Sequence, residues 1–257
     1  MKNKEIMDNA KDMDAVTGFY GKLPSHGDFL VRRLNRNFTA PWDQWLQTAI
    51  ADSQSQLGEQ WLNTYLVSPI WRFSLSSGIC GHSCWCGILM PSVDSVGRYF
   101  PLTIATPLPA ESDISRLFSE QHDWFEQCEA LALDALNGDI PLDHFDQSLC
   151  QLDPPSVPLN KTQLQGYQTP QPAWCFNLES PQQSTAKLSE LALSLLADRL
   201  PARSYWCAQN AEQINSTLLI TAGLPPSQGF SALLDGQWKA WGWGGEPYNG
   251  SDLDIEQ

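Results

Sequence analysis

A short stretch of the chain, residues 17–28, gathers the side-chain types of a hydrolytic site. It reads TGFYGKLPSHGD, in which an apolar-aromatic run ends in a polar turn with Ser25, His26 and Asp28. Serine, histidine and aspartate are the nucleophile, the base and the orienting acid of a catalytic triad. Adjacent residues cannot form one, because the base must reach its two partners from separate backbone positions. A split site that uses His26 with Asp28 or Ser92 stays open as an alternative.

A structural interpretation of the same turn is favoured. Gly21 and Gly27 permit tight backbone geometry, Pro24 fixes its φ angle, and Asp28 is suited to an Asx-type turn. His26 could act as a contact that titrates near neutral pH. We therefore expect no catalytic residues here and no enzymatic activity in the chain.

A second cluster has the residue types of a zinc site, namely Cys80, His82, Cys84 and Cys86. All four have the same parity, so on one strand they would point the same way in a line. Successive same-face residues of a strand are about 6–7 Å apart, whereas zinc binds its ligands at about 2.0–2.3 Å. We therefore expect buried thiols, with no metal and no cofactor.

The third candidate is the segment 91–101, in which Asp94 and Arg98 lie four residues apart in a turn between two expected strands. An exposed local ion pair is one interpretation, and such a pair contributes only about 0–1 kcal/mol. The other is that this loop and the turn after residue 21 lie close together and form one recognition surface. Both interpretations stay open at this stage.

Composition narrows the class of protein. The 257 residues include 29 acidic and 15 basic side chains, for a net charge of −14, which argues against a nucleic-acid partner and anionic membranes. No run of about 18 apolar residues occurs, so no membrane insertion is expected. The N-terminal segment lacks the apolar core of a signal peptide, and the seven cysteines are an odd number. These features predict a cytoplasmic protein with reduced thiols.

Hydrophobic periodicity predicts the elements that must position these residues. A helix capped by Thr39 and punctuated by Gly58 carries apolar residues at helical spacing. Further helices are expected over residues 61–66, 114–136, 187–200 and 230–234. Strands are expected over residues 17–23, 71–76, 83–90, 99–107, 173–178, 205–208 and 217–222.

The three central strands have short links, which indicates an antiparallel meander. The predicted fold class is therefore α+β: a mainly antiparallel sheet flanked by helices, in a single domain with a long Pro-rich loop. We expect a disordered lead over residues 1–14, one domain over 15–245 and an acidic tail over 246–257. The Pro-rich loop is expected over residues 151–172.

Four blocks, in this order and spacing, resemble the TagF family, also called ImpM, of proteins associated with bacterial type VI secretion. They are GFYGKLPSHGDF at 18–29, PWDQWL at 41–46, WRF at 71–73 and PSVDSVGRYFPL at 91–102. SYW at 204–206 and GLPP at 223–226 resemble the C-terminal part of the family more loosely. The resemblance covers most of residues 17–235.

The resemblance implies a cytoplasmic accessory protein that represses type VI secretion after translation. In the family this repression is linked to binding the forkhead-associated-domain protein of the system, and no catalysis is implied. A structural assembly subunit of the apparatus is the alternative, beside the hydrolase above. We expect the two loops to bind the partner through Lys22, Ser25, His26, Asp28, Arg32, Ser92, Asp94 and Arg98.

Overall fold

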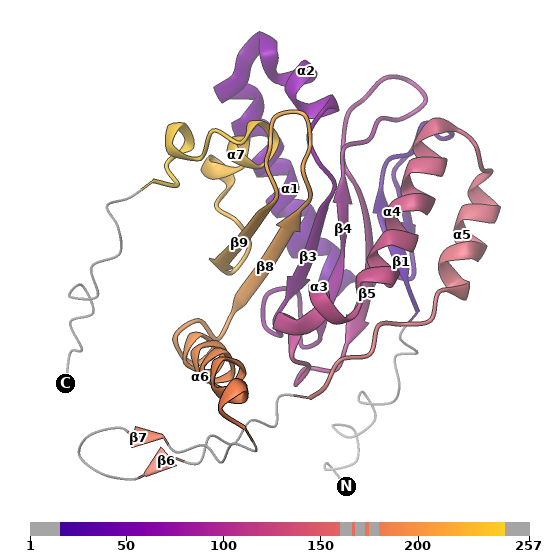
Figure 1. Cartoon of the computed structure of the whole chain (residues 1–257). Coiled ribbons are helices and arrows are strands. Elements are labelled where there is room, and N and C mark those ends of the chain that lie inside the picture. The colour runs from indigo at the N-terminus through magenta and orange to yellow at the C-terminus, as the bar shows by residue number, and fades with distance from the viewer. Residues whose placement is uncertain (1–15, 160–165, 168–172, 175–179, 245–257) are drawn as a thin grey trace, which may run out of the picture.

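The computed structural model describes residues 16–159, 166–167, 173–174 and 180–244. A seven-stranded sheet has the order β2-β1-β5-β4-β3-β8-β9, and every neighbouring pair is antiparallel (Figure 1). Its strands are β1 (Gly18–Gly21), β2 (Leu30–Arg32), β3 (Trp71–Leu75), β4 (Cys84–Met90), β5 (Leu102–Leu108), β8 (Arg203–Ala208) and β9 (Thr217–Ala222). A separate two-stranded pair joins β6 (Gly166–Tyr167) and β7 (Ala173–Trp174).

Helices cover both faces of the sheet. They are α1 (Arg36–Leu57), α2 (Trp61–Leu66), α3 (Leu117–Glu120), α4 (His122–Asn137), α5 (Leu142–Gln151), α6 (Ser184–Arg199) and α7 (Ser231–Asp235). Short 3-10 turns are η1 (Gly58–Gln60), η2 (Ile114–Arg116), η3 (Pro181–Gln183), η4 (Ser227–Gly229) and η5 (Trp238–Trp241). This arrangement confirms the predicted α+β class with an antiparallel sheet flanked by helices in a single domain.

The two faces bury separate apolar clusters, and β4 shows why. All seven of its residues are buried, and their side chains alternate between the faces. Trp85 and Leu89 join the cluster that α1 and α7 cover, whereas Cys86 and Ile88 join the cluster that α4 and α5 cover. A central strand covered on both sides therefore reads as a continuous apolar run.

Aromatic side chains dominate the first cluster. The fully buried Trp42 of α1 stacks on Trp206 of β8 with ring centroids 6.0 Å apart and lies 4.7 Å from Phe73 of β3. Its indole Nε1 donates to Thr103 Oγ1 at 2.9 Å, so the one polar atom of the ring is satisfied inside the core. These contacts fix α1 across the middle of the sheet.

Two helix predictions were wrong in detail. The first helix begins at Arg36, because Asn35 rather than Thr39 is its cap: Asn35 Oδ1 accepts from Phe38 N at 3.1 Å. The apolar periodicity starts only at Phe38, so it could not show the polar first turn. The expected helix over 114–136 is divided into η2, α3 and α4, and the backbone leaves helical geometry at Gln121 (φ −120°, ψ 30°).

Other differences concern the second half of the chain. The periodicity does not predict α5, although Phe145 and Leu149 on one side of this helix are buried. Residues 175–178 of the expected strand over 173–178 lie outside the described residues, as do the expected lead at 1–14, the tail at 246–257 and much of the Pro-rich segment. Helix α4 ends at the C-cap Gly138, which has the left-handed φ of 78° that glycine favours.

A buried ion pair attaches α4 to the sheet. Arg72 of β3 is buried and makes a bidentate contact with Glu129 of α4, in which Nη2 donates to Oε2 at 2.9 Å. The guanidinium also contacts His122 Nδ1 at 2.8 Å and lies over the ring of Phe125. Without the carboxylate, a buried cation would be left with no counter-charge.

We predict that Glu129→Gln lowers the free energy of unfolding by about 3 kcal/mol, the low end for breaking a buried pair, because Glu129 is partly exposed. Urea unfolding measures the change. Glu120→Gln is the matched control, since it removes the exposed pair with Arg116 and is expected to cost at most about 1 kcal/mol. Equal losses in the two variants would contradict this role for Arg72.

Candidate functional site

The topology brings two loops together at one end of the sheet. Strand β1 pairs with β5 so that Tyr20 lies opposite Thr103, which places the turn after β1 beside the loop that precedes β5. At Gly21 (φ 130°) a Cβ atom would lie 2.1 Å from Pro101 O, so only glycine permits this close approach. We call the segments 22–29 and 91–101 together the two-loop surface.

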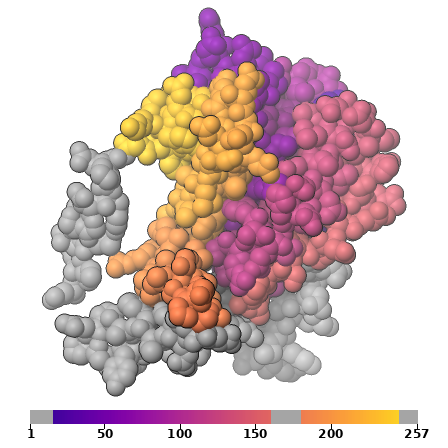
Figure 2. Space-filling view, in the orientation of Figure 1, coloured from indigo at the N-terminus to yellow at the C-terminus, as the bar shows by residue number. Residues whose placement is uncertain are grey.

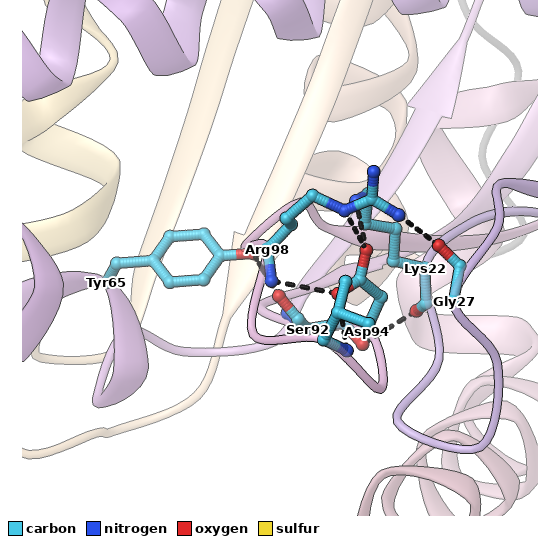
Figure 3. Close-up of polar contacts among 7 residues, drawn as sticks. Lys22, Gly27, Tyr65, Ser92, Asp94 and Arg98 are labelled. Carbon is cyan, nitrogen blue, oxygen red and sulfur yellow. Dashed lines mark hydrogen bonds and ion pairs between the residues drawn. The ribbon is translucent and has the colours of Figure 1, made fainter.

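Three backbone carbonyls of the first loop accept hydrogen bonds from the second loop, among them the carbonyl of Gly27 that Figure 3 shows beside Arg98. Ser92 Oγ donates to Lys22 O at 2.7 Å, and Ser95 N donates to His26 O at 3.0 Å. The guanidinium of Arg98 donates to Gly27 O. The loops therefore lie close together and form one unit, and their role in recognition stays a prediction.

The centre of this unit is the carboxylate of Asp94, which is shielded from solvent. Its Oδ1 accepts from the backbone N–H groups of Val96 at 3.0 Å and Arg98 at 2.8 Å. Its Oδ2 accepts from Lys22 Nζ and from Arg98 Nε, the latter at 2.7 Å. Figure 3 shows Lys22 and Arg98 converging on this carboxylate from the two loops.

These partners control the ionisation of Asp94. Burial alone would raise the pKa of this carboxyl, but the Lys22 ammonium and the hydrogen bonds from Arg98 and Val96 hold its pKa well below the usual range. Asp94 is therefore a carboxylate at every physiological pH. Asp94–Arg98 is thus one part of a buried network rather than a simple exposed pair.

Tyr65 of helix α2 anchors the second loop through its hydroxyl group. The buried Tyr65 hydroxyl donates to Ser92 O at 3.0 Å and accepts from Ser92 N at 2.9 Å. Burial raises the pKa of this hydroxyl, so it keeps the proton that it donates. Sequence reasoning missed Tyr65 as a site residue, because its helical spacing with Trp61 marks it only as core.

The predicted contact residues fall into two groups. Lys22, Ser92 and Asp94 are buried and hold the loops in place. Ser25 and Asp28 are exposed at the turn, His26 is half-buried, and the Arg98 side chain is largely exposed. Arg32 is exposed on β2 but pairs with Phe19, farther along β1, and makes none of the cross-loop contacts described.

Sequence reasoning also missed two apolar side chains on this surface. Phe29 is 45% exposed, and its ring packs against Phe100 with centroids 4.7 Å apart. Val96, at the tip of the second loop, is 67% exposed. Their apolar character in polar loops was the available signal, since such side chains are usually buried or at interfaces.

The side chains of the split hydrolytic site are not assembled together. The buried Ser92 hydroxyl donates to a backbone carbonyl, and His26 Nδ1 contacts the neighbouring Ser25 Oγ at 2.9 Å. Within the part of the chain that the structure describes, no carboxylate lies within ion-pair distance of the His26 ring. The turn has the residue types of a triad without its geometry.

The cysteine cluster is divided between the two faces of the sheet. Cys80 belongs to one apolar cluster, and Cys84 and Cys86 belong to the other. Burial raises the pKa of the Cys80 thiol to about 12 and raises that of Cys86 as well, so both are neutral thiols. Among the described residues, no group of three or more histidine, cysteine or acidic side chains could hold a metal ion.

Fold and site together define a protein class: an α+β domain with a two-loop surface at one end of its sheet, held in place by hydrogen bonds to a buried carboxylate. The model of the TagF N-terminal domain, described as type VI secretion system-associated, matches residues 18–152. The chain therefore belongs to the TagF family, and is a type VI secretion-associated protein.

A solved structure is similar to this protein over nearly the whole chain. The crystal structure of PA0076 from Pseudomonas aeruginosa PAO1 is similar with a TM-score of 0.73 and 36% sequence identity. The match covers 91% of this chain and 97% of PA0076. No curated protein matches the chain. No described helix has both the length and the apolar character that crossing a membrane requires.

We predict that Asp94→Asn flattens the acid dependence of stability. A carboxyl whose pKa is lower folded than unfolded stabilises the fold above the unfolded value, about pH 4, and this stability is lost as the pH falls toward the folded value. The free energy of unfolding of wild type, measured with urea, should therefore fall more steeply below about pH 4 than that of the variant. Parallel curves would contradict the network.

Proposed function

We propose that this protein represses type VI secretion in the cytoplasm, after translation, by binding the forkhead-associated-domain component through the two-loop surface. Membership of the TagF family supports the connection with secretion. The observation that carries the choice of surface is the buried Asp94 network, which holds both loops rigid while their tips stay exposed. Rigid loops bind with a small loss of conformational entropy.

The tips have the composition of a binding site. Phe29 provides an aromatic anchor that is already held in place, by Phe100 on one side and by the Lys22 ammonium 5.4 Å from its ring centroid. Val96 adds exposed apolar area on the neighbouring loop. Aromatic anchors surrounded by a polar rim are typical of interface centres.

Charged groups around the anchors supply the rim. Asp28 and the Arg98 guanidinium give the surface both signs of charge, in a chain whose net charge is −14. His26 lies beside them with its imidazole on the exposed side chain of Ser25. We propose that these groups fix the orientation of the partner, while Lys22, Ser92 and Asp94 act only by holding the loops.

We predict that Val96→Asp weakens binding of the forkhead-associated-domain protein by at least about tenfold, because it places a charge at the centre of the interface. Capture of the partner by purified protein, quantified by titration, measures the effect. Leu188→Asp on α6 is the matched control, since Leu188 is 62% exposed and lies outside the two-loop surface. Equal affinity of both variants would refute the assignment of this surface.

A second prediction concerns the direction of regulation. Deleting the gene should increase secretion and overproducing the protein should decrease it, because a binding repressor acts by occupying its target. Overproduced Val96→Asp protein should repress less than overproduced Leu188→Asp protein. Loss of secretion on deletion would instead identify a structural assembly subunit.

A further inference from the structure

The sheet has two edges of different chemistry. At one edge, β2 has only three residues, one of which is the exposed Arg32, and it is followed by Arg33 in a left-handed conformation (φ 57°). Short length and charge are devices that prevent an edge strand from pairing with another chain. At the other edge, β9 has six residues, Thr-Leu-Leu-Ile-Thr-Ala, without charge or proline.

The register identifies the backbone groups that β9 presents at this edge. Gly223 N donates to Ala202 O at 2.7 Å, and hydrogen-bonded pairs alternate along an antiparallel ladder. The N–H and C=O groups of Leu218, Ile220 and Ala222 therefore point away from β8. Of the described strands, β8 is the one that pairs with β9.

Side chains make the same edge apolar. Leu218 and Ile220 point to one face of the sheet, and both are exposed large hydrophobic residues. Figure 2 shows the surface of this part of the chain, in orange, between α6 and the yellow α7 and η5 region. Exposed backbone groups together with exposed apolar side chains make β9 a template for an added strand.

Charge indicates which strand would be added. Residues 213–234 carry no charged side chain, although the chain as a whole has a net charge of −14. Another copy would bring the same excess of negative charge, which opposes self-association least where the facing segments carry no charge. The β9 edge meets this condition.

We propose that β9 pairs with β9 of a second copy of the chain about a two-fold axis. With the axis at Ile220, this residue lies opposite its equivalent, and Leu218 lies opposite Ala222 of the other copy. The outward N–H and C=O groups of all three residues are then paired, and the two sheets become continuous. The two-loop surface lies beside β1 and β5, away from this edge, so a dimer would present it twice.

Sedimentation equilibrium of the full chain tests the proposal. Wild type is expected to show a concentration-dependent monomer–dimer equilibrium, and Ile220→Lys to weaken it by at least about tenfold, since a charge would be buried in the pair. Leu188→Lys is the control and should dimerise as wild type does. Wild type that stays monomeric, or an Ile220→Lys variant that dimerises equally, would overturn the proposal.

Hydrogen exchange at single amides locates the contact. The amides of Leu218, Ile220 and Ala222 should be protected only at concentrations where the dimer forms, because their N–H groups point outward. Those of Leu219 and Thr221 should be protected in both states, because they face β8. Protection of Ile220 in the dilute monomer, or a dimer without protection there, would show that another segment or surface is used.

Discussion

A single carboxylate determines the arrangement of the two-loop surface. Four donors, two from the backbone and two from cationic side chains, fill the acceptor positions of Asp94 in a site that solvent does not reach. A buried charge is tolerable only when it is paired and hydrogen-bonded, so the loops are constrained to the geometry that satisfies it. The positions of the exposed loop tips therefore depend on the buried Asp94 carboxylate.

The sheet provides the frame that this centre requires. Pairing of β1 with β5 brings Lys22 close to Asp94. Tyr65 reaches Ser92 from α2, and α2 packs in the same apolar cluster as α1. Gly21 lets β1 run close enough to Pro101 for these contacts to form. The site therefore depends on three elements far apart in the sequence, all positioned by one core.

Much of the fold could be predicted from local patterns. The short links between the three central strands predicted the antiparallel meander that β3, β4 and β5 form. The start of α1 and the break at Gln121 could not be predicted, because polar first turns and single-residue kinks leave the apolar periodicity almost unchanged. Helix α5 was missed, since its short apolar pattern has few repeats.

For the site, sequence reasoning found the two loops but not the buried contacts that hold them together. It paired Asp94 with Arg98, four residues away, whereas the buried partner Lys22 is 72 residues away. Long-range partners of this kind become visible only when the strand order is known. The same reasoning grouped buried Lys22 and Ser92 with exposed Asp28, because residue type does not report burial.

The separation of the buried network from the loop tips has a consequence for divergence within the family. The exposed side chains of Ser25, Asp28 and Val96 can change without disturbing the groups that hold the loops, since Asp94 uses only the backbone of Val96. Recognition of a new partner can therefore arise through substitutions at the tips that leave folding intact. Loss of Asp94, in contrast, would leave the buried Lys22 ammonium without its carboxylate.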